Sequence, residues 1–248
     1  MLKIQNLTKN FGGLKAVNDV SVSIEQGSIT AIIGPNGAGK TTFFNLISGA
    51  IKPSSGSMLL NNQEIAGLKA SQVAQHGVAR TFQTTHLFEQ ATVLDNLIVG
   101  HRLRTSSGFW DVLFNTSRLR REEKECRDKA EEALDFVGLS HKANAYAADI
   151  TQEEKKRVAF ALALTTSPQI LLLDEPAGGV NPEETLGLAR LIKKLVDHGK
   201  TICLVEHKMD MIMSLADKIL VLHHGQKLAE GTPSEIQQNQ AVIEAYLG

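Results

Sequence analysis

The stretch Gly34 Pro35 Asn36 Gly37 Ala38 Gly39 Lys40 Thr41 Thr42 stands between an apolar run at 29–33 and a helical pattern at 40–48. It satisfies the spacing GxxxxGK followed by Ser or Thr, in the strand, loop and helix context that this pattern requires. Glycines let successive backbone N–H groups curl around phosphate oxygens, and the N-terminus of the following helix adds partial positive charge. Lys40 would place its cation on the β and γ phosphates, and the Thr41 hydroxyl would ligate Mg²⁺. A glycine-rich turn that caps a helix is the alternative, and the matching context favours nucleotide binding over it.

Outside this stretch, length and composition describe an ordinary globular chain. Its 248 residues predict one larger domain with a subdomain. The 26 Lys and Arg residues balance 27 Asp and Glu residues, so no polybasic field favours a nucleic-acid partner. No run of about 18 apolar residues occurs and the N-terminus lacks the order of a secretion signal, so we expect neither direct membrane insertion nor export. Cys126 and Cys203 match no metal-ligand spacing, and we expect free thiols in the cytoplasm.

Hydrophobic patterning on either side of the glycine-rich stretch predicts an α/β fold. Alternation at 2–7 and 20–24 is typical of half-buried antiparallel strands, and Asn61 and Asn62 predict a hairpin turn within 57–65. From residue 170 onward, apolar runs alternate with helical patterns, which indicates a mainly parallel sheet.

A second segment, 86–157, has a different character. It is rich in Arg, Lys, Glu and Ala and shows helical periodicity at Ala130, Leu134 and Val137. We therefore expect a helical subdomain at 86–157, inserted into a core made by 1–85 and 158–248. Its apolar cluster at 109–114 fits a short packed insertion better than a membrane-surface helix.

Polar side chains follow other predicted strands. The apolar run at 170–173 ends in Asp174 and Glu175, and a later run ends at His207. Ligands of α/β sheets bind at the carboxyl ends of the strands, so Asp174 would hold Mg²⁺ and Glu175 would orient or deprotonate an attacking water. His207 could reach a γ-phosphate, although alone it would be read as a solvated or core histidine. Gln83 also stands at a strand end, and alone it would be read as an ordinary loop residue. Four such polar residues at strand ends, Gln83, Asp174, Glu175 and His207, are much less expected by chance.

With the turn GVNP at 179–182, the order and spacing of these motifs resemble those of the ATP-binding subunit of an ABC transporter. The resemblance covers essentially the whole chain. Four phrases resemble the ATPases of branched-chain amino acid importers more narrowly, although importers of urea or other amides share much of the wording. They are FGGLKAVNDVS at 11–21, VARTFQTTHLFEQATVLDNLIVG at 78–100, DEPAGGVNP at 174–182 and AVIEAYLG at 241–248. The resemblance implies an ABC ATPase domain over 1–248, with a mixed sheet, a RecA-like parallel part, and ATP and Mg²⁺ as cofactors.

The resemblance also implies roles for single residues. Phe11 would stack on adenine, where the alternative is a core or hairpin phenylalanine. Gln83 would approach Mg²⁺ and sense the γ-phosphate, and 84–93 would meet the permease. Asn181 takes the place that aspartate usually holds in the turn where two subunits communicate. The phosphate loop would bind ATP through Gly34, Pro35, Asn36, Gly37, Ala38, Gly39, Lys40, Thr41 and Thr42.

One motif departs from the family. The segment Ile150, Thr151, Gln152, Glu153 and Glu154 stands where LSGGQ is expected, and of that motif the hydroxyl at Thr151 survives. Thr151 and Glu154 also spell a capping box, so the segment is either a contact for a partner's ATP or simply a well-capped helix start. Because a carboxylate there would compete with a partner's γ-phosphate, we expect this chain to pair with a paralogous ATPase rather than with itself.

The resemblance thus implies one half of an ATPase dimer that powers a membrane permease from the inner face of the cell membrane. Its cargo would be branched-chain amino acids or related amino acids and amides. A soluble ABC ATPase acting on nucleic acid or ribosomes, or an ATP-binding scaffold without turnover, is the alternative. The first would predict a basic stripe, which the sequence lacks, and the second would predict loss of Glu175 or His207, which it retains.

Overall fold

The apolar run that leads into the glycine-rich loop forms β3 (Ile29–Ile33), and all five of its residues are buried. The computed structural model describes residues 1–81, 87–102, 111 and 116–247. Two compact units contain them: Met1–Arg80 joined with Pro168–Gly248, and Thr81–Ser167. The second unit is wider than the 86–157 expected from the sequence; at its C-terminal end, helix α6 (Gln152–Leu164) continues past residue 157 without a break.

The first unit is built on a sheet with the strand order β10-β9-β3-β8-β7-β6. β3 pairs in parallel with β8 and β9, β7 pairs in parallel with β8, and β10 pairs antiparallel with β9. The predicted mainly parallel sheet is thus confirmed, and it brings the carboxyl ends of β3, β7 and β8 to the same edge. These strands are β6 (Val78–Thr81), β7 (Ile170–Asp174), β8 (Thr201–Val205), β9 (Lys218–His223) and β10 (Gln226–Gly231).

A second, antiparallel sheet in the same unit has the order β2-β1-β4-β5. The strands predicted at 2–7 and 20–24 are longer than expected, because register shifts let the hairpin continue to a turn at residues 12 and 13. Asn61 and Asn62 form the predicted turn with φ of 49° and 66°, which asparagine tolerates better than most residues. The bounds are β1 (Leu2–Phe11), β2 (Leu14–Ile24), β4 (Ser55–Leu60) and β5 (Gln63–Glu64).

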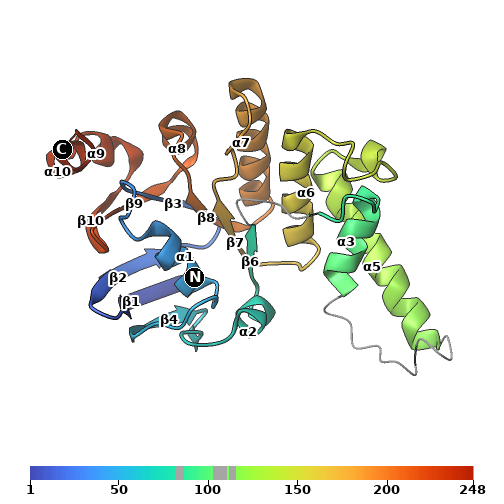
Figure 1. The fold of residues 1–248 in the computed structure, drawn as a ribbon, viewed down its shortest axis with the longest axis horizontal. Coiled ribbons are helices and arrows are strands. Elements are labelled where there is room, and N and C mark those ends of the chain that lie inside the picture. Colours follow the sequence, from blue (N-terminus) through green and yellow to red (C-terminus); the bar gives the residue numbers. More distant parts are fainter. Residues whose placement is uncertain (82–86, 103–110, 112–115, 248) are drawn as a thin grey trace. The chain divides into compact units, whose positions relative to one another are not determined.

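Two apolar cores lie on opposite faces of the parallel sheet. Ile32 belongs to a core that includes the antiparallel sheet and α1, whereas its neighbour Ile33 belongs to a core under α8, α9 and α10 (Figure 1). Alternate residues of one strand point to opposite faces, so β3 contributes to both cores. The helices of this unit are α1 (Lys40–Ile47), α2 (Ala70–Gln75), α7 (Pro182–Asp197), α8 (Met209–Leu215), α9 (Pro233–Gln237) and α10 (Gln240–Leu247).

The second unit is helical in the part that the structure describes. Ala130, Leu134 and Val137, which carried the helical periodicity, are all buried. The apolar cluster predicted at 109–114 lies outside the described residues except for Asp111. Among the described residues, no helix combines the length and apolar character needed to cross a bilayer. The elements are α3 (Val93–Arg102), α5 (Ser117–Phe136), η1 (Ser140–Lys142) and α6.

Neither cysteine forms a disulfide, as the sequence predicts, and both are buried. Cys203 lies in β8 within the core, and burial raises the pKa of its thiol because the charged thiolate would lose its hydration. Cys126 lies on the buried face of α5, with its Sγ 3.1 Å from His101 Nδ1.

We expect Phe43→Ala to lower the free energy of unfolding by about 3–5 kcal/mol, because its ring is fully buried between α1 and the sheets and its loss leaves a cavity. Urea unfolding followed by circular dichroism measures the change. Leu186→Ala on the exposed face of α7 serves as the control and should shift stability by less than about 0.5 kcal/mol. Equal effects of the two variants would contradict this assignment of the core.

Candidate functional site

The phosphate loop runs from the end of β3 to the start of α1, and two of its glycines have no room for a side chain. A Cβ on Gly34 would lie 2.1 Å from the carbonyl oxygen of Leu222, and one on Gly39 would lie 2.4 Å from that of Ala16. Gly39 also has a φ of +99°, in the left-handed region that favours glycine. The N-terminus of α1 has Gly39 as its N-cap residue, which offers no capping side chain. Its first N–H groups can therefore donate to an anion.

Lys40, the first residue of α1, is buried and directed back onto the loop. Its Nζ donates to the carbonyl oxygens of Gly34 and Pro35, at 2.7 and 3.0 Å. Burial lowers the pKa of its ammonium, and the nearby Glu175 carboxylate opposes that shift. Thr41, the next residue, is exposed on the first turn of α1. Lys40 and Thr41 therefore occupy the positions at which the sequence predicts a phosphate cation and a metal-binding hydroxyl.

The predicted catalytic pair comes together at the carboxyl edge of the parallel sheet. Glu175 directly follows β7, and its Oε1 lies 3.1 Å from His207 Nε2. The amide of Glu175 donates to the carbonyl oxygen of Val205 at 2.8 Å, which joins the end of β7 to the end of β8. Its φ of +47° is uncommon for a residue with a side chain, so this geometry is imposed by the surrounding strands. A carboxylate held by an imidazole can accept a proton from a positioned water.

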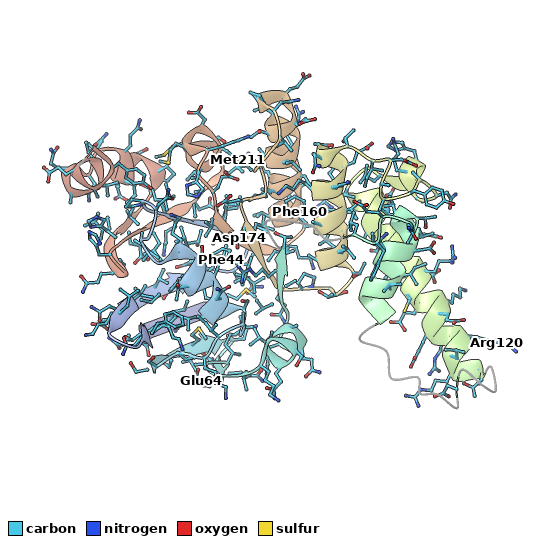
Figure 2. The ribbon with its side chains drawn as sticks, viewed as in Figure 1. Phe44, Glu64, Arg120, Phe160, Asp174 and Met211 are labelled. Atoms are coloured by element: carbon cyan, nitrogen blue, oxygen red, sulfur yellow. The ribbon has the colours of Figure 1, made fainter. Side chains whose placement is uncertain are left out.

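Asp174, the last residue of β7, forms an ion pair with Arg80, with 2.7 Å between Oδ2 and the guanidinium nitrogen. Asp174 lies at the predicted metal-binding edge, and Figure 2 labels it there, with Phe44 on α1. Gln83, the third predicted metal ligand, lies outside the described residues.

Glu206 is a site residue that the sequence analysis did not assign. Its side chain is buried, and one oxygen accepts a hydrogen bond from the amide of Ala177 at 3.1 Å. The other oxygen accepts from the amides of His207 and Lys208, at 2.9 and 3.3 Å. One buried carboxylate thus ties the segment after Glu175 to the segment that carries His207. The available signal in the sequence was its place directly after the apolar run 202–205.

Phe11 and Asn181 have more specific surroundings than the sequence could give. Phe11 ends β1 with half of its surface exposed, so it is a hairpin residue rather than a core residue, and its ring is free of the core for stacking. Lys9 Nζ lies 5.0 Å from the centre of that ring. Asn181 caps α7, because its side chain accepts a hydrogen bond from the amide of Glu184 at 2.9 Å.

Tyr246 near the C-terminus is a second residue that the sequence analysis did not assign. Burial raises the pKa of its hydroxyl, while the nearby backbone of Gly34 works in the opposite direction. Val242, one turn earlier on α10, packs in the same core as Ile33. The C-terminal helix therefore lies against the strand end from which the phosphate loop starts.

In the second unit, the segment that replaces LSGGQ forms the predicted capping box. The amide of Glu154 donates to Thr151 Oγ1 at 3.2 Å, and the amide of Thr151 donates to Glu154 Oε2 at 2.8 Å. Lys142 Nζ lies 3.3 Å from Glu154 Oε1. Burial alone would raise the pKa of Glu154, but the contacts with Thr151 and Lys142 outweigh it and lower the pKa. Glu153 pairs with Arg157, which also donates to the carbonyl oxygen of Val137.

Comparison with known proteins agrees with this geometry. Residues 17–178 match the ABC transporter family, and residues 226–248 match the branched-chain amino acid ATP-binding cassette transporter family. The chain is 43% identical to the high-affinity branched-chain amino acid transport ATP-binding proteins LivG of Escherichia coli and BraF of Pseudomonas aeruginosa, covering 100% of this chain and 98% of each relative.

Solved structures of ATP-binding cassettes share the fold. A nucleotide-free cassette from an ABC transporter has a TM-score of 0.88 at 32% identity, over 100% of this chain and 99% of that one. The ADP conformation of the cassette MJ1267 has the same TM-score and identity, over 100% and 98% of the two chains. A dimeric cassette, MJ0796, has a TM-score of 0.77 at 26% identity, over 94% and 99%.

We expect Lys40→Ala to weaken ATP binding at least about 10²-fold, because two charge-assisted contacts with phosphate oxygens are lost. Isothermal titration calorimetry measures the affinity. Lys200→Ala is a matched control, since Lys200 also donates to a backbone carbonyl but precedes β8, at the opposite edge of the sheet. Unchanged affinity in Lys40→Ala, or an equal loss in the control, would contradict the assigned role.

Proposed function

The chain belongs to the ABC transporter family and is an ATP-binding, ATP-hydrolysing subunit of a transporter, and we propose that this transporter imports branched-chain amino acids or related amino acids and amides. The observation that carries the turnover is the Glu175–His207 pair at the sheet edge that also carries Asp174. The match of 226–248 and the identity to LivG and BraF support the cargo class. A scaffold without turnover would not need this pair.

ATP and Mg²⁺ fit the residues present. The start of α1, whose N-cap residue Gly39 has no side chain, suits a chain of phosphates, as does the buried Lys40. At Gly34 and Gly39 the loop backbone also packs too closely for a Cβ. The oxygens of Thr41, Asp174 and Gln83 are ligands that suit Mg²⁺. When bound, the ion would neutralise charge that develops on the phosphates.

The chain's own residues would then divide the work. Lys40 exchanges its loop carbonyls for phosphate oxygens, and the loop amides bind the remaining phosphate oxygens. His207 Nε2 holds Glu175 Oε1, so that the carboxylate is fixed while it orients or deprotonates the attacking water. Phe11 stacks on the adenine ring, a contact worth about 1 kcal/mol that should affect affinity more than rate.

We expect Glu175→Gln to keep ATP binding and to slow hydrolysis at least about 10²-fold, the usual effect of removing a positioned base. Phosphate release under single-turnover conditions measures the rate, and calorimetry measures the binding. Glu183→Gln, an identical chemical change in the exposed first turn of α7, serves as the control and should leave both unchanged. Hydrolysis by Glu175→Gln at the parent rate would show that Glu175 is not the base.

The partners follow from the same reasoning. Transmembrane permease subunits would receive this chain at the inner face of the membrane, with 84–93 as the contact segment. A second ATPase would complete each nucleotide site, as the dimeric cassettes among the similar structures suggest. That partner should be a paralogue with an intact signature, since the amide of Glu154 already donates to Thr151 Oγ1 and the carboxylate of Glu154 would repel a γ-phosphate.

In this arrangement the productive site combines Lys40, Asp174, Glu175 and His207 of this chain with the partner's signature, whereas the opposite site turns ATP over slowly. We therefore expect Glu175→Gln to stop transport in the assembled complex. Replacing the partner's equivalent glutamate should be tolerated. Transport into membrane vesicles that hold one or the other altered complex provides the measurement. If the partner's change alone stops transport, the assignment of the two sites is reversed.

A further inference from the structure

We infer that Arg80 is a positioning residue that fixes the magnesium-binding carboxylate of Asp174 relative to helix α1. Arg80 lies near the end of β6, and β6 is the neighbour of β7, which ends in Asp174. The exposed fractions of the two side chains are 9% and 12%, so the ion pair is largely removed from water. This inference rests on the proposed function, because it assigns Arg80 a role toward the metal site of that reaction.

Within the described part of the chain, the guanidinium contacts polar groups of Asp174, Asn45 and Ser48. One terminal nitrogen lies 2.7 Å from Asp174 Oδ2. The other donates to Asn45 Oδ1 at 2.6 Å and to Ser48 Oγ at 3.2 Å. The cation also lies 5.8 Å from the centre of the Phe44 ring. The planar fork of arginine can make these contacts at once, whereas the ammonium of lysine is a single point charge.

The position of these partners on α1 gives the contacts a consequence for the metal site. Thr41, Asn45 and Ser48 follow the spacing i, i+4, i+7, which places them on one face of the helix. Thr41 and Asp174 are the two described residues expected to ligate Mg²⁺. One terminal nitrogen of Arg80 binds Asp174, and the other binds Asn45 and Ser48 on the face of α1 that also carries Thr41. Arg80 therefore fixes the position of the Asp174 carboxylate relative to Thr41.

The carboxylate is engaged on one side. Among the residues that the structure describes, no hydrogen bond reaches Asp174 Oδ1, while Oδ2 is held by Arg80. Hydrogen bonds to a metal-binding carboxylate orient it, and loss of such a partner typically weakens metal affinity or activity about 10–100-fold. Arg80 is thus placed to orient Asp174 while Oδ1 remains available to the ion.

Binding in the presence and absence of the metal tests this inference in the full chain. We expect the ATP affinity of Arg80→Gln in EDTA to stay within about twofold of the parent, since the phosphate loop is intact. The gain in affinity on adding Mg²⁺ should fall about 10–100-fold. Arg80→Lys keeps the charge but not the fork and should retain part of that gain. Calorimetry with ATP in the two buffers provides both affinities.

Asn45→Ala is the second variant, because it removes the anchor on α1 while leaving the buried ion pair intact, so it should fold even if Arg80→Gln does not. It should also reduce the gain from Mg²⁺. The inference would be overturned if Mg²⁺ raised the ATP affinity of both Arg80→Lys and Asn45→Ala as much as it raises that of the parent. A larger rise than the parent's in either variant would also overturn it. Absence of ATP binding by the parent in both buffers would instead contradict the proposed function.

Discussion

The close approach of the phosphate loop to two carbonyl oxygens is the constraint on which the rest of the structure depends. Gly34 is pressed against Leu222 of β9 and Gly39 against Ala16 of β2, so the loop is held between the parallel and the antiparallel sheet. Gly225, just after β9, reinforces this, since its amide donates to Ala38 and its carbonyl accepts from Asn18. Both sheets must be in place before the loop can present its amides to phosphate.

The same construction explains why the chemistry gathers at one edge. Parallel pairing of β3, β7 and β8 brings the phosphate loop, the two carboxylates and His207 to the carboxyl ends of adjacent strands. Two charged side chains, Arg80 and Glu206, are largely buried between these ends. Each connects segments that are distant in the sequence, and each would be costly to bury without its partners. They hold in place the groups that would contact the nucleotide.

The second unit departs from the family at the segment where a partner's ATP would bind. There, the side chains of Thr151 and Glu154 each accept a hydrogen bond from the other's backbone amide. Lys142 forms an ion pair with the Glu154 carboxylate. A helix start that is satisfied internally gains local stability and loses capacity for an external anion. The proposed pairing with an unlike ATPase, with one of the two sites active, would follow from this exchange.

Local sequence determined the phosphate loop, the strand ends at Asp174, Glu175 and His207, the alternation of strands with helices, and the capping box. In each case the signal is a spacing that a single strand, turn or helix imposes on its own residues. The tertiary structure decided what depends on distant segments, such as the ion pair of Arg80 with Asp174, whose strands are neighbours in the sheet but far apart in the chain. It also decided the bounds of the helical unit and the role of Glu206. The hydrophobic periodicity of a single helix or strand does not predict these contacts, because the order of the strands in the sheet decides which distant residues become partners of a buried charge.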